Sequence, residues 1–390
     1  MTIKKVVLTG ADASAEAMRQ INPDVVAAYP ITPQTPVMHK FCEFVANGKV
    51  HTEFITVESE HSAMSATLGA SAAGSRAMTA TSANGLALMF EIVYIAASNR
   101  LPIVMQVVNR ALSGPINIHC DHSDTMACRD SSWIQLYSEN AEEVYENTIM
   151  AIKLAETVNL PVMVCQDGFI TSHSVESLNI LDDKTVRNFI GEYKPDNYLL
   201  NIKKPITSGP LDFFDYYFEH KRQQIEAMDK VIPEFEKISK KFGKIFNKYY
   251  EPVEEYYLDD AEYVLVSISS TAGTVKHVVD LMRKKGKKVG SLKIRMFRPF
   301  PHDFIQKYLK GKKIVGILDR SASFGNFGPV YHEIKSSLYD MENKPKIVSY
   351  LYGLGGREIN EEQIEDCFNQ LISNKFNEQN FIGVRDKDER

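Results

Sequence analysis

The sequence is poor in cysteine and has no surplus of basic residues. Its five cysteines are far apart, and no two stand in a C-x-x-C pattern, which excludes a self-contained iron–sulfur or zinc motif of the usual spacing. Free thiols in a chain of this size indicate a reducing compartment, so we expect a cytoplasmic protein. The 45 basic residues are outnumbered by 50 acidic residues, which argues against binding of nucleic acid or membranes by bulk charge.

Long apolar runs are also absent. The first residues, up to Ser14, contain only a short apolar run and lack the pattern of a signal peptide. The longest weakly polar stretch, residues 62–99, contains Arg76 and Glu91, so it predicts a packed core and no membrane span. The chain of 390 residues is 44% hydrophobic and 24% charged, which excludes a disordered or fibrous protein and predicts two or three domains.

Short apolar strands alternate with helices in the first half of the chain. Continuous apolar strands in such an alternation form a parallel sheet that is covered on both faces, so we predict the α/β class. An Asn84-Gly85 turn is expected before a helix over residues 86–97. The predicted strands are Asp24–Tyr29, Phe54–Val57, Arg76–Thr81, Pro102–Val108 and Pro161–Gln166.

The alternation stops at about residue 176 and resumes near Ala261. Residues 193–257 hold 14 aromatic side chains, about twice the average of the chain, which argues against a disordered linker. We interpret residues 176–258 as a connecting arm, packed either on its own domains or against other subunits, where aromatic residues are enriched. Residues 259–360 form a smaller α/β domain, and residues 361–390 a helical, polar tail.

Polar residues follow the predicted strands, where parallel sheets bind ligands. Glu60 opens a helix of very small residues. It is either a first-turn glutamate favoured by the helix dipole or a carboxyl in a low-dielectric pocket, whose raised pKa lets it share a proton. The other residues at this rim are Tyr29 to Thr32, Ser82 to Asn84, Asn109, Arg110 and Asp167.

Arg110 ends an apolar strand, where an unpaired guanidinium is costly. It either pairs with Asp121 or Asp124 or clamps the carboxylate of a substrate. Thr32 lies between two prolines, which form a simple turn or hold its hydroxyl rigidly.

Two further segments carry weaker signals. Residues 117–124 (NIHCDHSD) mix His, Cys and Asp, but their spacing matches no standard metal site, so we predict a polar loop at a cleft and no metal ligand. The glycine-rich segment Gly353–Arg357 favours a tight loop at a domain edge over a phosphate site.

Several long segments, in the same order along the chain, resemble the 2-oxoacid:ferredoxin oxidoreductases. Residues 1 to about 360 are similar to the alpha subunit of the multi-subunit pyruvate:ferredoxin oxidoreductases. The segments are Tyr29–Pro36 (YPITPQTP), Glu58–Leu86, Asn109–Asp124, Arg129–Glu146, Asp167–Ser174, and the smaller domain up to Gly353–Ile359.

The resemblance implies both the domains and the reaction. Residues 1–258 would be the pyrimidine-binding domain of a thiamine diphosphate enzyme, and residues 259–360 a transketolase C-terminal-like domain. Members of this family decarboxylate a 2-oxoacid, transfer the acyl group to coenzyme A and pass two electrons to ferredoxin. Pyruvate is the expected substrate, and a branched-chain acid such as 2-oxoisovalerate is the alternative.

The resemblance also implies roles for the rim residues. Glu60 would hydrogen-bond the aminopyrimidine ring of thiamine and favour its imino tautomer. Thr32 and Arg110 would hold the keto and carboxylate oxygens of the substrate. Tyr29, Ser82 and Asn84 would line the cofactor.

A G-D-G motif followed by a downstream Asn is the pattern that resembles the magnesium–diphosphate site of these enzymes, and the chain does not contain it. It also has no set of cluster-binding cysteines. We therefore expect magnesium and the 4Fe–4S clusters on beta, gamma and delta subunits, with thiamine diphosphate shared between chains. Two other functions stay open, a lipoyl-transferring 2-oxoacid dehydrogenase component and a non-catalytic scaffold subunit.

Overall fold

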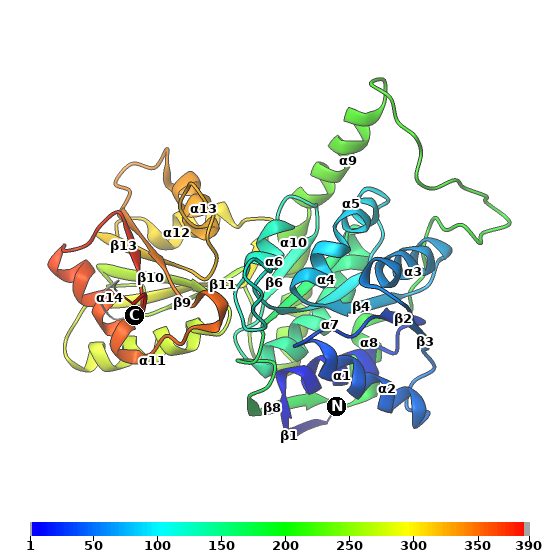
Figure 1. Ribbon diagram of the computed structural model, residues 1–390, viewed down its shortest axis with the longest axis horizontal. Helices are drawn as coiled ribbons and strands as arrows, with labels where there is room; N and C mark the ends of the chain where they lie inside the picture. Colours follow the sequence, from blue (N-terminus) through cyan, green and yellow to red (C-terminus); the bar gives the residue numbers. More distant parts are fainter. Residues whose placement is uncertain (1, 386–390) are drawn as a thin grey trace.

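A computed structural model describes residues 2–385, which form two units side by side, each built on a mostly parallel β-sheet (Figure 1). The first unit is coloured from blue to green and the second from yellow to red. This arrangement confirms the predicted α/β class.

Seven strands form the sheet of the first unit, in the order β12–β6–β7–β5–β4–β2–β3. All neighbours are parallel except β12, which is antiparallel to β6. Every residue of β4, β5 and β7 is buried, as expected for apolar strands covered on both faces. The strands are β2 (Val25–Ala28), β3 (Glu53–Thr56), β4 (Ala77–Thr81), β5 (Val104–Asn109), β6 (Ile134–Tyr137), β7 (Val162–Asp167) and β12 (Met296–Arg298).

Helices cover both faces of this sheet. Val164 and Cys165, which are consecutive in β7, belong to different apolar cores because alternate side chains of a strand point to opposite faces. The first core includes α1, α2 and α7; the second includes α3 and α5 and continues into the second unit. The helices are α1 (Gly10–Ile21), α2 (Thr35–Ala46), α3 (Glu60–Ala73), α4 (Ala83–Leu88), α5 (Phe90–Ser98), α6 (Ser123–Ala127) and α7 (Ala141–Val158).

The turn expected at Asn84-Gly85 is wrong. Both residues lie inside α4, and the helix expected over residues 86–97 is divided at Met89 into α4 and α5. The chain turns one residue earlier, at Ala83, where φ is 40°. The N–H of Ala83 donates to Oδ2 of Asp124 at 3.0 Å, and this bond holds the turn.

A small antiparallel sheet of β1 (Ile3–Thr9) and β8 (Val175–Leu181) was not predicted, and neither was β6. The apolar pattern of β1 is interrupted by Lys4 and Lys5, and its first residues are exposed. β8 leads directly into α8 (Asp183–Ile190).

The second unit has a six-stranded sheet in the order β15–β14–β13–β10–β11–β9, with β9 as the antiparallel edge. Residues 361–373, expected as the start of a helical, polar tail, form α14, whose Ile364, Phe368 and Leu371 are buried in the core of this unit; residues 386–390 of that tail lie outside the described residues. The elements are β9 (Val253–Tyr256), β10 (Tyr263–Ile268), α11 (Thr271–Lys284), β11 (Val289–Ile294), α12 (His302–Leu309), β13 (Ile314–Asp319), α13 (Pro329–Leu338), β14 (Lys346–Leu351), η1 (Leu354–Gly356), α14 (Glu361–Ser373) and β15 (Gln379–Phe381).

The two units exchange strands. β9 precedes residue 258 but belongs to the second sheet, and β12 follows it but extends the first sheet. Between them lies a buried charge cluster in which Lys293 of β11 contacts Glu139 at 2.7 Å and Glu143 at 2.6 Å. The units are therefore joined by backbone pairing, by ion pairs and by the shared second core.

The aromatic arm divides into a packed part and an exposed part. Phe235 and Phe242 of α10 (Val231–Phe246) are buried in the first core. The loop of residues 200–216 and α9 (Tyr217–Asp229) project from the body (Figure 1), and Ser208 and Gly209 tie the loop to Asn99 of the first unit. The prediction that the arm packs on its own domains is therefore wrong for the apolar side chains of residues 199–218, where Ile202 is 92% and Phe214 95% exposed. Among residues 2–385, no helix is long and apolar enough to cross a membrane.

Candidate active site at the carboxyl ends of the strands

Glu60 is the first residue of α3 and follows β3. Its side chain is buried at 8% exposure, and the Ser59 hydroxyl caps the helix by accepting a hydrogen bond from the N–H of Ser62 at 3.2 Å. The carboxylate lies against Gly85, where a Cβ atom would come within 2.9 Å of Oε1. No hydrogen bond reaches this carboxylate from any residue that the structure describes. Glu60 thus presents a buried carboxyl with free hydrogen-bonding capacity.

Two hydroxyls at the end of β4 are also unsatisfied. The oxygens of Thr81 and Ser82 are buried and have no partner within residues 2–385. Thr81 Oγ1 shares the space beside Gly85 with the Glu60 carboxylate, because a Cβ on that glycine would lie 2.4 Å from it. Buried polar atoms without a partner are uncommon and mark a place where a ligand can supply the missing bonds.

Asn84 and Tyr29 lie at the same rim in different surroundings. Asn84 is exposed, and its amide donates to Ser113 Oγ at 2.7 Å and accepts from the N–H of Ser113 at 3.0 Å. Tyr29 directly follows β2 and is half-buried.

Arg110 and Thr32 are brought together by the loops after β5 and β2. The Arg110 guanidinium is 7% exposed and donates from Nε to the carbonyl oxygen of Asn117 at 2.9 Å and from Nη1 to that of Thr32 at 2.8 Å. No ion pair of Arg110 exists within residues 2–385, so the pairing considered with Asp121 or Asp124 is wrong. A buried cation held only by neutral carbonyls leaves several N–H groups for an anion. The Thr32 side chain is exposed at this point.

Asp124 organises the rim and was not predicted as a site residue. Its carboxylate accepts from the backbone N–H groups of Ala83 and Arg110, each at 3.0 Å, and from Asn109 Nδ2 at 2.8 Å. Burial raises the pKa of Asp124 to about 6. The sequence signals were its place in the polar run NIHCDHSD and the pairing considered with Arg110, and neither shows that its partners follow two different strands.

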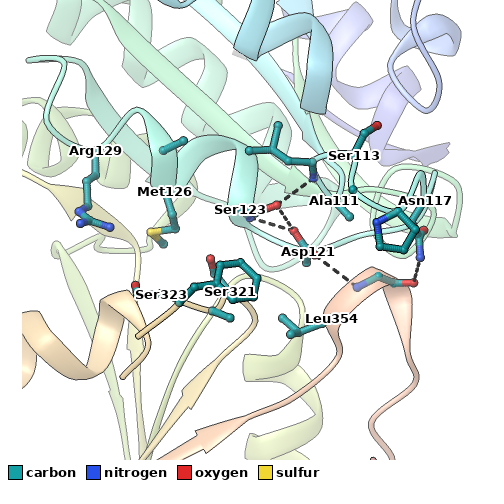
Figure 2. Close-up of a pocket in the computed structure, with 17 residues that line it drawn as sticks. Ala111, Ser113, Asn117, Asp121, Ser123, Met126, Arg129, Ser321, Ser323 and Leu354 are labelled. Atoms are coloured by element: carbon teal, nitrogen blue, oxygen red, sulfur yellow. Dashed lines mark hydrogen bonds between the residues drawn. The ribbon is translucent and has the colours of Figure 1, made fainter. Parts of the chain in front are cut away.

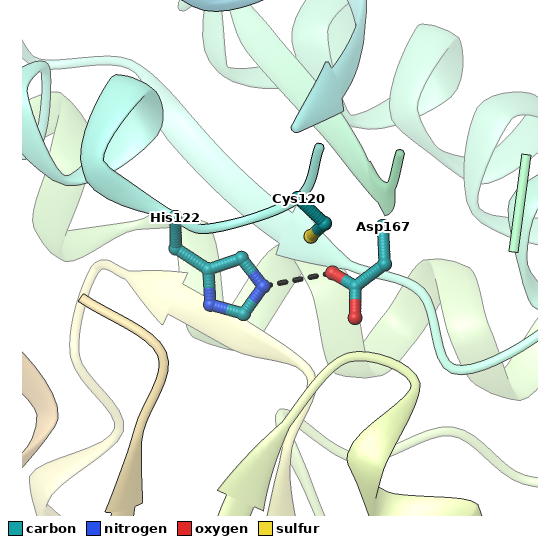
Figure 3. A group of neighbouring side chains, drawn as sticks. All are labelled: Cys120, His122 and Asp167. Carbon is teal, nitrogen blue, oxygen red and sulfur yellow. Dashed lines mark hydrogen bonds and ion pairs between the residues drawn. The ribbon is translucent and has the colours of Figure 1, made fainter. Parts of the chain in front are cut away.

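A second buried cluster joins the units at the end of β7 (Figure 3). Asp167 Oδ1 lies 2.7 Å from His122 Nε2, and Oδ2 accepts from Arg320 Nη1 of the second unit at 3.0 Å. Burial opposes the charge of Asp167, but His122 and Arg320 outweigh it and lower its pKa well below the usual range. Cys120 Sγ lies near these groups, 3.7 Å from Arg320 Nη1.

The described residues contain two clusters with the spacing of metal ligands, and both already hold protein cations. Arg320 contacts both Asp167 and Cys120 of the set Cys120–His122–Asp167. In the set Glu139–Glu143–Glu254, each carboxylate is paired with Lys293. These side chains would repel a bound cation, so neither cluster carries the features of a metal centre.

A cleft of about 590 Å³ lies where the two units meet (Figure 2). One wall is the loop that follows β5, with Asn117, Asp121 and Ser123. The other wall comes from residues 321–324 and 354–355 of the second unit.

Comparisons with known proteins identify the families and relatives that this chain resembles. Residues 16–240 match the family described as pyruvate flavodoxin/ferredoxin oxidoreductase, thiamine diphosphate-binding, and residues 261–364 match pyruvate:ferredoxin oxidoreductase core domain II. The pyruvate synthase subunit PorA of Thermotoga maritima is 59% identical, over 98% of this chain and 99% of that subunit. The ketoisovalerate oxidoreductase subunit VorA of Pyrococcus abyssi is 44% identical, over 92% of this chain and 90% of that subunit.

A solved structure shares the fold. It is a 2-oxoglutarate:ferredoxin oxidoreductase from Magnetococcus marinus, with a TM-score of 0.73 and 19% identity over 95% of this chain and 65% of that longer one. Because one family description covers more than half of the chain and a relative is 59% identical along nearly all of it, the resemblance seen in the sequence is confirmed: the chain belongs to the pyruvate flavodoxin/ferredoxin oxidoreductase family.

Proposed function

We propose that this chain is the alpha subunit of a pyruvate:ferredoxin oxidoreductase. The complex converts pyruvate and coenzyme A to acetyl-CoA and CO2 and passes two electrons to ferredoxin, in a reversible reaction. The observation that carries the proposal is the buried Arg110 guanidinium, which has no carboxylate partner within residues 2–385 and lies beside Thr32. The relative named pyruvate synthase subunit is also more similar than the one named ketoisovalerate oxidoreductase, at 59% against 44% identity.

The residues at the rim fit the pyrimidine end of thiamine diphosphate. The carboxyl of Glu60 and the hydroxyl of Ser82, which have no partner within residues 2–385, offer an acceptor and a donor, and Gly85 lets the backbone approach the carboxyl closely. The cofactor, when bound, supplies the nucleophilic carbon and the electron sink for decarboxylation. Tyr29 lines the same edge, and Asn84 would contact the cofactor in exchange for its bonds to Ser113.

Glu60 is proposed to hold a proton at a ring nitrogen of the aminopyrimidine. Its side chain is buried at 8% exposure and lies against Gly85, next to Thr81 Oγ1. No residue within 2–385 hydrogen-bonds this carboxyl, so a ring nitrogen beside it would find a free partner for proton exchange.

Arg110 and Thr32 are proposed to bind the substrate. Nε and Nη1 of Arg110 each use one N–H for a backbone carbonyl, and the remaining N–H groups form the charge-assisted pair with the carboxylate of the 2-oxoacid. The hydroxyl of Thr32 is a neutral donor to the keto oxygen. Both bonds fix the substrate for attack at its carbonyl carbon.

Partner subunits are proposed to supply the rest of the machinery. Among the five cysteines, four are buried and Cys42 is half-buried, with no cluster of cysteines among the described residues. We assign the 4Fe–4S clusters, magnesium and the diphosphate site to beta, gamma and delta subunits, with coenzyme A and ferredoxin as further partners. The exposed part of the arm, residues 199–218, is a surface for these subunits, and the complex is cytoplasmic.

The second candidate is a branched-chain 2-oxoacid oxidoreductase, which the VorA similarity favours. The test is anaerobic reduction of a viologen dye by the complex co-purified with this chain, with coenzyme A and pyruvate, 2-oxoisovalerate, 2-oxoglutarate, indolepyruvate or oxalate. Preference for pyruvate is the expected result. Preference for 2-oxoisovalerate would keep the chemistry and replace the substrate, and a requirement for lipoamide would reject the family reaction.

A further inference from the structure

The glycine-rich loop of the second unit, Gly353–Gly356, contacts the loop that follows β5 (Figure 2). The N–H of Gly356 donates to the carbonyl oxygen of Cys120 at 2.6 Å. The N–H of Gly355 lies 3.4 Å from Asp121 Oδ2, and the carbonyl oxygen of Gly355 accepts from Asn117 Nδ2 at 3.0 Å. Three hydrogen bonds thus attach the first unit's loop to a loop more than 230 residues later in the chain.

Asn117 connects this contact to Arg110. Its carbonyl oxygen accepts from Arg110 Nε at 2.9 Å, and its side chain donates to Gly355 and accepts from the N–H of His119 at 2.7 Å. One residue therefore holds the guanidinium on one side and the second unit on the other.

Hydrogen bonds, rather than apolar packing, hold the part of this loop around Asn117. Its apolar residues Ile116 and Ile118 are 77% and 41% exposed, so they do not anchor the loop in a core. Its position therefore depends on hydrogen bonds, those of Ser113 to Asn84 in the first unit and the three bonds to the second unit.

The contact requires glycine. Gly355 and Gly356 have φ values of 63° and 79°, which disfavour other residues. A Cβ at Gly355 would lie 2.4 Å from Asn117 Nδ2, and one at Gly356 would lie 2.3 Å from His119 Cβ. The segment Gly353–Arg357, predicted from the sequence as a tight loop, therefore packs against the loop that follows Arg110, and its glycines allow this close contact.

We propose that the Gly353–Gly356 loop positions the Arg110 guanidinium for the carboxylate of the 2-oxoacid, acting through Asn117. Asn117 and Gly355 are positioning residues and do not touch the substrate. This inference rests on the proposed function, in which Arg110 binds the carboxylate. It gives the second unit a direct part in substrate affinity.

The test is Gly355→Ala in the assembled complex, with Gly286→Ala as its matched control. Gly286 also has a positive φ, 74°, but a Cβ there meets nothing within 4 Å, so both variants carry the same backbone strain. We expect Gly355→Ala to raise the KM for pyruvate about tenfold, with kcat and the KM for coenzyme A little changed. Gly286→Ala should leave all three values as they are. An unchanged KM for pyruvate in Gly355→Ala, or equal changes in both variants, would overturn the proposal.

A double-mutant cycle with Arg110→Ala separates this inference from the proposed function. If the loop acts through Arg110, Gly355→Ala adds no further loss of kcat/KM in the Arg110→Ala background. If the losses from Gly355→Ala and Arg110→Ala add in full, the loop does not act through Arg110 and the positioning role is overturned. The proposed bond between Arg110 and the substrate carboxylate would still stand. If Arg110→Ala itself leaves the KM for pyruvate unchanged, the proposed clamp is wrong, and the inference with it.

Asn117→Ala provides the second variant, should Gly355→Ala not assemble. It removes the side-chain bond to Gly355 but keeps the backbone carbonyl that accepts from Arg110. We expect the same selective rise in the KM for pyruvate, and equal KM values for Asn117→Ala and the unmodified complex would reject the inference.

Discussion

The Nη1 atom of Arg110 donates a hydrogen bond of 2.8 Å to the backbone carbonyl oxygen of Thr32, which joins the loops after β5 and β2. The two residues proposed to hold the 2-oxoacid are thus fixed to each other before the substrate arrives. Because Thr32 uses its carbonyl for this bond, its hydroxyl is left for the substrate. Such preorganisation reduces the ordering that binding requires.

Arg110→Lys should lower kcat/KM for pyruvate about 100-fold, since an ammonium cannot keep both carbonyl contacts and a bidentate grip on a carboxylate. Arg100→Lys is the control, because the Arg100 guanidinium also donates to backbone carbonyls, those of Asn159 and Val158 at 2.8 Å, away from the rim. Initial rates of viologen reduction measure the effect. Equal losses in both variants would contradict the clamp.

Glu60→Ala should lower kcat of the assembled complex by about 10²- to 10⁴-fold, because no other group would remain to exchange a proton with the aminopyrimidine. Glu58→Gln, an exposed change two residues away, should have little effect. A complex with normal turnover and Ala at position 60 would support the scaffold function instead.

Arg320→Met should destabilise the protein by about 3–5 kcal/mol, because the charge of Asp167 would stay buried without one of the two side chains that offset its burial, His122 and Arg320. The added change Asp167→Asn should restore most of the loss, since it removes the charge itself. Calorimetric melting of the complex measures both effects. A double variant less stable than Arg320→Met alone would show that the loss does not come from the buried charge of Asp167.

Glu146 gives a pH dependence of stability. Burial raises its pKa to about 7, above the ordinary glutamate range, so between about pH 4.5 and 7 the folded chain keeps a proton that the unfolded chain releases. The contribution of Glu146 to the free energy of unfolding therefore falls as pH rises through this interval, by about 3 kcal/mol at most. Above pH 7 this contribution is constant.

Glu146→Gln should flatten this part of the pH profile of the melting temperature. Glu142→Gln is the matched control on the same helix, since Lys248 outweighs burial and lowers the pKa of Glu142. The contribution of Glu142 to the free energy of unfolding is instead lost as pH falls below the ordinary pKa of a glutamate, because its pKa in the folded chain is lowered. The same slope before and after Glu146→Gln would show that another group titrates here.

The exposed arm should be covered in the complex. We expect backbone amides of residues 199–218 to exchange with deuterium more slowly in the assembled complex than in the free chain, because partner subunits exclude water from Phe213 and Phe214. Equal exchange in both states would show that the arm is not an interface.

The sequence was informative where burial alone decides the structure. The wholly buried β4, β5 and β7 were predicted, and so was the position of Glu60, Thr32 and Arg110 at the rim, because polar residues at the ends of parallel strands gather there. β12 could not be predicted, since three residues that include Arg298 carry no strand pattern. Asn117 and Gly355 were missed as partners because their contact spans 238 residues and depends on a glycine-only backbone.

The strand β12 has a mechanical consequence. It is the edge strand of the first sheet, yet it continues directly from β11 of the second. A hinge motion between the units would have to break its backbone pairing with β6 and the ion pairs of Lys293. The two units should therefore move and unfold as one body, and access to the rim must come from loops or from the partner subunits.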